Sequence, residues 1–155
     1  AEQENMPASQ GGIRVERTYS KVIRENGQLR LQKLESGATV TSGDEIEVTL
    51  TVNADRDYEW LMMDDPLPSG FEPIREYYGH YGWHWNYWYS RKEFRDQKVS
   101  IAMTTLWRGQ HTANYRMRAE TPGDFHALPS QVFNMYHPEI GGNSEEFRIK
   151  VVDKN

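Results

Sequence analysis

Residues 45–52, with the sequence EIEVTLTV, place an aliphatic side chain at every second position. The four aliphatic residues alternate with two glutamates and two threonines. A period of two is the pattern of a β-strand that buries one face, because successive side chains of a strand point to opposite sides. The turn residues Ser42, Gly43 and Asp44 come directly before this segment. Residues 45–52 are therefore expected to form a strand of a sheet that covers a hydrophobic core.

Shorter segments with the same alternation recur along the chain, and glycine or proline separates most of them. They are Ile13 to Tyr19 with Ile13, Val15 and Tyr19 as its apolar row, the pair Leu29 and Leu31, Tyr58 to Met63, Val99 to Met103, Ala113 to Ala119 with Tyr115 and Met117 inward, and Phe147 to Val151. No long segment keeps a helical period. The pattern predicts an all-β fold, an antiparallel two-sheet β-sandwich, with a small barrel as the alternative.

The bulk composition restricts the possible function classes. A length of 155 residues fits one domain with its own core. Residues 1–12 are polar and end in glycine, so they are expected to form a disordered lead-in or linker before a single sandwich domain at 13–155. The formal net charge of -5 disfavours binding to nucleic acid. No stretch of the sequence approaches the ~20 consecutive apolar residues of a membrane helix. This chain is therefore not expected to insert into a membrane.

The least ordinary segment is Tyr77 to Tyr89, YYGHYGWHWNYWY, which contains no aliphatic residue. Read as a strand, it places Trp83, Trp85, Tyr87 and Tyr89 on one side as a packing face, and His80, His84, Asn86 and Trp88 on the other side toward a partner. Core packing, contact with another protein and sugar stacking remain alternatives for so much aromatic surface. The candidate aromatic interaction surface comprises Trp83, Trp85, Tyr87 and Trp88.

His80 and His84 share a face of that strand, and a histidine pair is a common start for a zinc or copper site. A usable site needs at least a third ligand, and His111, His126 and His137 are the candidates for it. Sequence alone does not bring these histidines together, and the chain has no cysteine to act as a thiolate ligand. No metal and no other cofactor is therefore expected.

Asp64 and Asp65 look like a catalytic carboxylate pair, but adjacent strand residues point to opposite faces. A structural role in a turn is expected for them, because Pro66 and Pro68 follow directly and stiffen the backbone. The chain also lacks a Gly-x-Ser-x-Gly elbow and a phosphate-binding loop. The protein is therefore not expected to be an enzyme. Tyr115 is either a tyrosine whose hydroxyl ties a sandwich corner or an ordinary core residue.

Three motifs occur in a fixed order: DDPLPSGFEP at 64–73, YRMRAETPG at 115–123 and MYHPE at 135–139. A charged stretch, RKEFRD at 91–96, stands between the first two. Together they resemble the carboxy-terminal domain of bacterial alpha-2-macroglobulins, over roughly residues 13–152. The resemblance implies a macroglobulin-like β-sandwich, related in shape to immunoglobulin and fibronectin III domains. The aromatic segment at 77–89 is longer than the connection usual in that family.

The family resemblance also implies a function. Such proteins are large protease-trapping inhibitors of the bacterial cell envelope, periplasmic or at the outer surface, and this domain packs on a neighbouring helical domain that carries a reactive thioester. The chain itself has no Cys-Gly-Glu-Gln sequence and no bait region, so it would be a noncatalytic part of a longer inhibitor. Its partners would be the neighbouring thioester domain and, through the full-length parent, host or foreign proteases.

By the same resemblance, Met135, Tyr136, Pro138 and Glu139 form the loop that contacts the thioester domain. A thioether and an aromatic ring there would exclude water from a hydrolysable bond. His137 falls where the family loop is variable. The competing hypothesis is a carbohydrate-binding β-sandwich that uses Trp83, Trp85 and Tyr87 as an exposed, coplanar platform.

Overall fold

The structure is a computed structural model that describes residues 12–75, 88–95 and 97–155. The described residues form thirteen strands. In chain order these are β1 (Ile13–Glu25), β2 (Gln28–Lys33), β3 (Ala38–Thr41), β4 (Glu45–Ala54), β5 (Tyr58–Pro66), β6 (Phe71–Pro73), β7 (Arg91–Arg95), β8 (Lys98–Leu106), β9 (Gly109–Ala119), β10 (Gly123–Ala127), β11 (Gln131–Asn134), β12 (Gly141–Asn143) and β13 (Phe147–Val152). The prediction of an all-β fold is confirmed.

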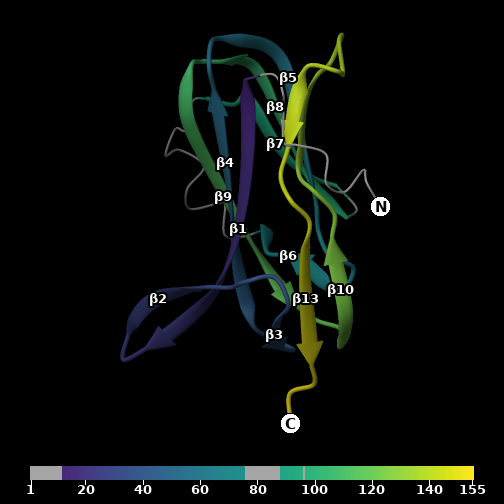
Figure 1. The fold of residues 1–155 in the computed structure, drawn as a ribbon. Helices are drawn as coiled ribbons and strands as arrows, with labels where there is room; N and C mark the ends of the chain where they lie inside the picture. Colours follow the sequence, from purple (N-terminus) through teal and green to yellow (C-terminus); the bar gives the residue numbers. More distant parts are fainter. Residues whose placement is uncertain (1–11, 76–87, 96) are drawn as a thin grey trace.

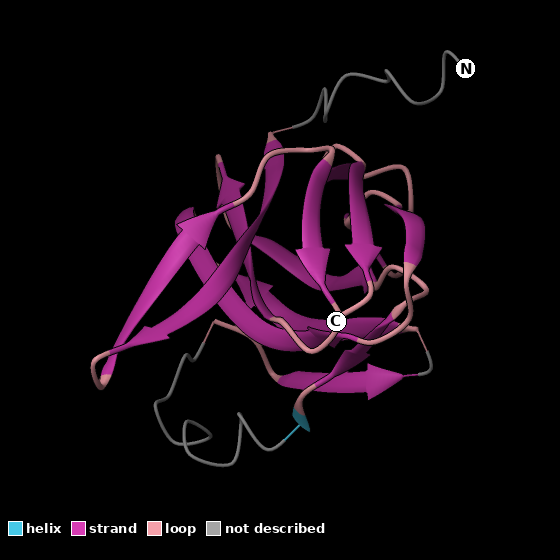
Figure 2. Cartoon of the chain, turned by 90° about the horizontal axis from the view of Figure 1, so that it is seen from below, coloured by secondary structure: helices cyan, strands magenta, loops and turns pink. Residues whose placement is uncertain are grey.

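The strands form two layers around one core (Figures 1 and 2). One layer is a five-stranded sheet in the order β2-β1-β4-β9-β6. The other layer is divided into a five-stranded sheet, β12-β11-β5-β8-β7, and a three-stranded sheet, β10-β13-β3. Every described strand pairing is antiparallel except that of β13 with β3. The β-sandwich expected from the sequence is confirmed, with its second layer split into two sheets.

The segment at 45–52 lies at the centre of the first layer, as its alternation indicates. Ile46, Val48, Leu50 and Val52 are 0% exposed on β4, which pairs with β1 on one side and β9 on the other. Tyr115 and Met117 on β9 are equally buried, so their inward orientation is confirmed. A side chain on this face is fully removed from water, and each buried aliphatic residue contributes about 1.5–3 kcal/mol.

The hairpin of β1 and β2 departs from the expected pattern. Its outer strand β2 is exposed along its whole length, and it extends away from the body of the sandwich (Figure 1). Leu29 and Leu31 alternate as a strand should, yet they are 51% and 44% exposed. Alternation predicts a strand but does not ensure that a second layer covers it.

The first two family motifs lie side by side at the end of the sandwich. Phe71 pairs with Ala119, and the Gly70 carbonyl accepts hydrogen bonds from the amides of Glu120 and Thr121 (2.8 and 3.2 Å). A Cβ on Gly70 would lie 2.5 Å from the ring of Phe125, so only glycine fits without displacing that ring. The close approach of the two backbones at Gly70 thus explains why these two motifs occur together.

Asp64 and Asp65 were expected in a turn, but the structure places both in strand β5. Asp65 is buried, and Asp64 lies on the opposite face of the strand.

Lys92 on β7 connects the two layers through its side chain. Its Nζ donates a hydrogen bond to the Asn114 carbonyl on β9 (3.0 Å) and lies 5.6 Å from the centre of the Tyr89 ring. Burial lowers the pKa of Lys92 to about 8. The Lys92 ammonium group therefore loses its proton at a lower pH in the folded chain than in the unfolded chain.

This difference predicts a pH dependence of stability. Between pH 8 and 10 the unfolded chain binds more protons at this lysine, so the free energy of unfolding should rise with pH, by up to about 2 kcal/mol. Urea unfolding followed at pH 7.5 and 9.5 measures the rise. Lys92→Met should abolish it, and an equal rise in that variant would contradict the assignment.

Candidate functional site

A buried ion pair lies between the layers, where strand β1 faces strand β5. Arg17 Nη1 donates to Asp65 Oδ1 at 2.7 Å, and the two side chains are 1% and 0% exposed. The Tyr115 hydroxyl donates to the other oxygen of Asp65 at 2.5 Å. Complete burial raises the pKa of Asp65, while the Arg17 guanidinium and the hydrogen bond from Tyr115 act in the opposite direction. Tyr115 therefore ties one layer to the other through its hydroxyl.

Arg17 also donates hydrogen bonds to three backbone carbonyls of the second layer. Nη1 donates to Leu128 O (2.7 Å), and Nη2 donates to Ala127 O (3.2 Å) and Glu145 O (3.1 Å). One guanidinium thus connects β1 with the end of β10, the segment before β13 and, through Asp65, strand β5. A planar group with several donors is suited to this role in a way that lysine is not. The ion pair fixes the position of β5 in the sandwich.

Sequence reasoning missed Arg17, although a signal was present. It occupies the position between Val15 and Tyr19 in the inward row of β1, and Asp65 follows Leu61 and Met63 in the inward row of β5. A charge in an apolar row needs a partner of opposite sign, because an unpaired buried charge is very costly. One cation and one carboxylate in two such rows could have been paired from the sequence.

The predicted contact loop follows strand β11 and is held by one side chain. Asn134 Oδ1 accepts hydrogen bonds from the amides of Tyr136 (2.8 Å) and His137 (2.9 Å), and Asn134 Nδ2 donates to Glu59 O (2.9 Å). The asparagine backbone amide donates to Ile140 O (2.9 Å), which closes the loop. An asparagine that bonds the amides two and three residues on is a common turn former. Sequence reasoning did not single out Asn134.

Trp60 on β5 forms the other side of this surface. Its carbonyl accepts a hydrogen bond from the Met135 amide (2.9 Å), and its φ of 61° lies in the left-handed region that bulky residues rarely adopt. The unusual backbone breaks the alternation of β5, since Tyr58 and Leu61, three residues apart, are both buried. Such strain costs on the order of 1–3 kcal/mol and persists where the surrounding structure maintains it. In the sequence, the only sign of this strained backbone is the spacing of three residues between Tyr58 and Leu61.

The loop and Trp60 together form an exposed surface that we call the Trp60–Tyr136 patch, defined by Trp60, Met135 and Tyr136. These side chains are 45%, 42% and 71% exposed. A depression of about 730 Å³ adjoins them, lined by residues 56–60, Asn134, Tyr136 and His137. Pro138 and Glu139, the other predicted contact residues, are exposed in the same loop. Aromatic and methionine side chains that face water on ordered backbone are typical of protein contact surfaces.

The predicted aromatic surface is corrected at one residue. Trp88 was expected to face a partner, but it is 5% exposed in the core, and its Nε1 donates to Thr112 O (3.0 Å). The Trp88 ring stacks on the ring of His111 and meets the ring of Tyr89 edge to face. Trp88 and Tyr89, which are adjacent in sequence, therefore both pack against the core. The regular alternation therefore does not extend to Trp88. Trp83, Trp85, Tyr87, His80 and His84 lie outside the described residues.

The other histidines considered as metal ligands occupy different places. His111 is on β9 with its ring next to Trp107 O (2.6 Å), His126 is on β10 near Glu146, and His137 is in the contact loop near Glu139. Within residues 12–75, 88–95 and 97–155, no cluster of three or more histidine, aspartate or glutamate side chains has an arrangement that could hold a metal ion. The same residues contain no helix with the length and apolar character needed to cross a membrane.

Two of the motifs meet in the structure, because β6 pairs with β9 and Tyr115 of the second motif donates a hydrogen bond to Asp65 of the first. The family model of the bacterial alpha-2-macroglobulin MG10 domain matches residues 12–139. The chain belongs to this family. The resemblance seen in the motifs at 64–73, 115–123 and 135–139 is thereby confirmed. All three motifs of this MG10 domain lie within the matched region, as do Arg17 and Trp60.

Three alpha-2-macroglobulins that are similar to this MG10 domain are much longer chains. An alpha-2-macroglobulin homolog of Nostoc is 26% identical over 98% of this chain, which spans 8% of that protein. An alpha-2-macroglobulin of Thermotoga maritima is 32% identical over 61% of this chain and 6% of that protein. The cryo-EM structure of the native conformation of Escherichia coli alpha-2-macroglobulin has the same fold, with a TM-score of 0.72, 21% identity and coverage of 95% of this chain and 10% of that one.

Proposed function

We propose that this MG10 domain is a noncatalytic part of a protease-trapping bacterial alpha-2-macroglobulin, and that it packs on the thioester domain of its parent through the Trp60–Tyr136 patch. In the native state the patch covers the thioester and keeps water from it. The parent acts in the cell envelope, in the periplasm or at the outer surface. The observation that carries the proposal is a loop with two exposed side chains, Met135 and Tyr136, on a backbone held by Asn134 and Trp60.

Two physical features support this role. First, the loop is held by side-chain and backbone hydrogen bonds, so docking would require little loss of conformational freedom. Second, the patch combines a thioether with two aromatic rings, and such apolar groups shield an acyl carbon from attack by water. The domain acts by stabilising the native conformation of the parent, and cleavage of the bait region would shift the parent to a conformation in which the patch no longer covers the thioester.

The test is to change Met135 and Tyr136 to alanine together in the full-length parent. Spontaneous thioester loss, followed as appearance of the free cysteine thiol, should become faster because water reaches the bond. The isolated 155-residue chain with the same changes should unfold at an unchanged urea concentration, since both side chains are exposed. An unchanged rate of thiol release in the parent would refute the shielding role.

The Trp60→Gly variant tests the contribution of the patch to shielding separately from the stability of the domain. Glycine adopts a φ of 61° without strain, and this relief offsets part of the stability lost with the half-buried ring, so the variant should lose less stability than truncation of such a ring normally costs. Thiol release in the parent should nevertheless become faster. Leu29→Ala is the matched control, because Leu29 is comparably exposed (51%) on β2 and lies outside the patch. A rate increase in the control as large as in Trp60→Gly would contradict the assignment of the patch.

A further inference from the structure

Strand β2 is an open edge of the first layer. It pairs with β1 on one side, and none of the other strands in the described part of the chain pairs with it on the other side. All six residues of Gln28–Lys33 are exposed, with Leu29 at 51% and Leu31 at 44%. The hairpin that it forms with β1 extends away from the two layers (Figure 1). An exposed row of unpaired backbone groups is a template for pairing with another strand.

The geometry of the hairpin determines which backbone groups of β2 face outward. Asn26 and Gly27 have φ values of 52° and 75°, which is the two-residue type I′ turn of a regular hairpin. Beyond the other end of β2, the Leu34 amide donates to the Tyr19 carbonyl (2.8 Å). Hydrogen-bonded pairs alternate along an antiparallel ladder, so the even-numbered residues of β2 also bond to β1. The outward N–H and C=O groups are therefore those of Leu29, Leu31 and Lys33.

The other edges of the three sheets have protection that β2 lacks. The edge strands β3, β6, β10 and β12 have only three to five residues, and β6 ends in Pro73. The edge strand β7 has the charged residues Arg91, Glu93 and Arg95 at alternate positions. Short strands, prolines and charges are the usual means by which a sheet edge avoids pairing with another chain. Strand β2 has six residues, no proline and two exposed leucines, so a partner is expected to cover it.

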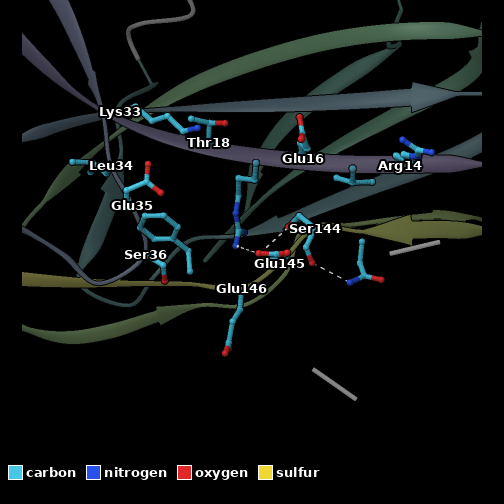
Figure 3. A pocket seen from close by; sticks show the side chains of 14 residues that line it. Arg14, Glu16, Thr18, Lys33, Leu34, Glu35, Ser36, Ser144, Glu145 and Glu146 are labelled. Atoms are coloured by element: carbon cyan, nitrogen blue, oxygen red, sulfur yellow. Dashed lines mark hydrogen bonds between the residues drawn. The ribbon is translucent and has the colours of Figure 1, made fainter. Parts of the chain in front are cut away.

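The open edge ends at Lys33. Figure 3 shows Lys33 and Leu34 at one end of a cleft of about 570 Å³ between β1 and residues 143–147. No strand fits into that cleft, because Arg17 Nη2 donates across it to Glu145 O (3.1 Å) and because Tyr19 on β1 is 1% exposed. Addition of a strand is therefore restricted to the projecting hairpin.

The side chains of β2 favour a guest strand with acidic and aliphatic residues. The sequence QLRLQK has two cations, Arg30 and Lys33, and no carboxylate. Arg30 lies 3.5 Å from Glu25, and both side chains are more than half exposed, so this ion pair is weak. Residues directly opposite each other in neighbouring strands share a face. Aliphatic residues opposite Leu29 and Leu31, and acidic residues opposite the two cations, would therefore match β2.

A second copy of this chain fits the edge less well. Two β2 strands side by side would bring four cations together, and like charges on neighbouring strands are destabilising. A contact through six residues is also much smaller than the roughly 20–30 residues a side of a stable interface. A contact of this size suits a segment that is already tethered in the same molecule.

We propose that the open edge of β2 binds an extended segment of the parent chain with aliphatic and acidic side chains, which adds to the first layer as a sixth strand. The chain spans 8% or less of its sequence relatives, so most of such a parent lies outside these residues. A tethered segment has an effective concentration on the order of millimolar and needs only modest intrinsic affinity. The inference rests on the proposed function only in that the domain is part of a longer chain. It involves neither the Trp60–Tyr136 patch nor the thioester.

The proposal is tested on the 155-residue chain with a synthetic probe, the acetylated and amidated hexapeptide Glu-Thr-Val-Glu-Val-Thr. In antiparallel register this peptide places its valines opposite Leu31 and Leu29 and its glutamates opposite Lys33 and Arg30. In a titration followed by ¹H–¹⁵N NMR, saturable shifts should be confined to the hairpin, residues 20–33, with a Kd of about 1 mM or tighter. Hydrogen exchange at the Leu29 and Leu31 amides should slow at saturation. The same peptide with N-methylated valines, which lack the two N–H donors, should not bind.

Charge reversal provides the matched variants. Arg30→Glu changes an exposed side chain of β2 and should weaken binding of the peptide about fivefold without loss of fold. Arg91→Glu makes the same change on the edge strand β7, where Arg91 is also exposed and paired with one glutamate, and should leave binding unchanged. Equal weakening by both variants, binding of the N-methylated peptide, or no saturation at roughly 5 mM peptide would overturn the proposal.

The full-length parent identifies the occupant. The Leu29 and Leu31 amides should exchange more slowly in the purified native parent than in the 155-residue chain, because the tethered segment covers them. Equal exchange rates in the two proteins would overturn the assignment to a segment of the parent. Shifts of the β2 amides of the 155-residue chain with protein concentration alone would overturn it in favour of a second copy.

Discussion

Asp65→Asn should destabilise the 155-residue chain by about 3–5 kcal/mol. The substitution keeps the shape of the side chain but removes the negative charge 2.7 Å from Arg17 Nη1, where the arginine side chain is 1% exposed. An uncompensated guanidinium would then remain between the layers, far from water. Urea unfolding followed by tryptophan fluorescence measures the loss as a lower midpoint with an unchanged slope.

The neighbouring residue provides the control. Asp64 accepts hydrogen bonds from Ser100 Oγ (2.8 Å) and Lys98 Nζ (3.2 Å) and is 24% exposed, so Asp64→Asn should cost only about 0–1 kcal/mol. A double change of Arg17 to methionine and Asp65 to leucine should not restore full stability, because three backbone carbonyls would lose their donor. Similar losses in the two single variants would contradict a dominant role for the buried pair.

The parts of the fold that alternation determines were predictable from the sequence. The strand at 45–52 and the inward row of β9 were correct because every second side chain there is apolar and the layer opposite is complete. Leu29 and Leu31 do lie on a strand, as their alternation indicates, but they are exposed because that strand projects from the sandwich. A local pattern carries no information on whether another layer covers a strand.

The candidate site was predictable only in part, for a related reason. Met135 and Tyr136 were reached through a family motif, whereas the hydrogen bonds of Asn134 and the backbone of Trp60 depend on the pairing of β5 with β11, which are far apart in sequence. Trp88 was misplaced because the strand alternation assumed for residues 77–89 does not extend to it. The long-range pairing of strands therefore determines those features of the site that residue type and spacing in the sequence could not predict.

Gly141→Ala should destabilise the chain by about 2–3 kcal/mol and loosen the contact loop. A Cβ on Gly141 would lie 1.9 Å from the Val132 carbonyl oxygen and 3.0 Å from Phe133 Cα, so the backbones of β12 and β11 would have to separate. Backbone atoms cannot turn aside as a flexible side chain can. The separation would weaken the closure of the loop, where Asn134 N donates to Ile140 O.

Two measurements separate the local effect from the global one. Urea unfolding reports the loss of stability, and hydrogen exchange at the Asn134 amide reports opening of the loop, which should become faster than the global loss alone requires. Asn143→Ala on the same strand is the control, because the described hydrogen bond of its side chain goes only to the adjacent Ser144 carbonyl (3.0 Å), and it should cost less than about 1 kcal/mol. In the full-length parent, Gly141→Ala should also speed thiol release although Met135 and Tyr136 are unchanged, because a patch on a loosened loop shields poorly. Faster exchange with an unchanged rate of thiol release would show that the rigidity of the loop does not contribute to shielding.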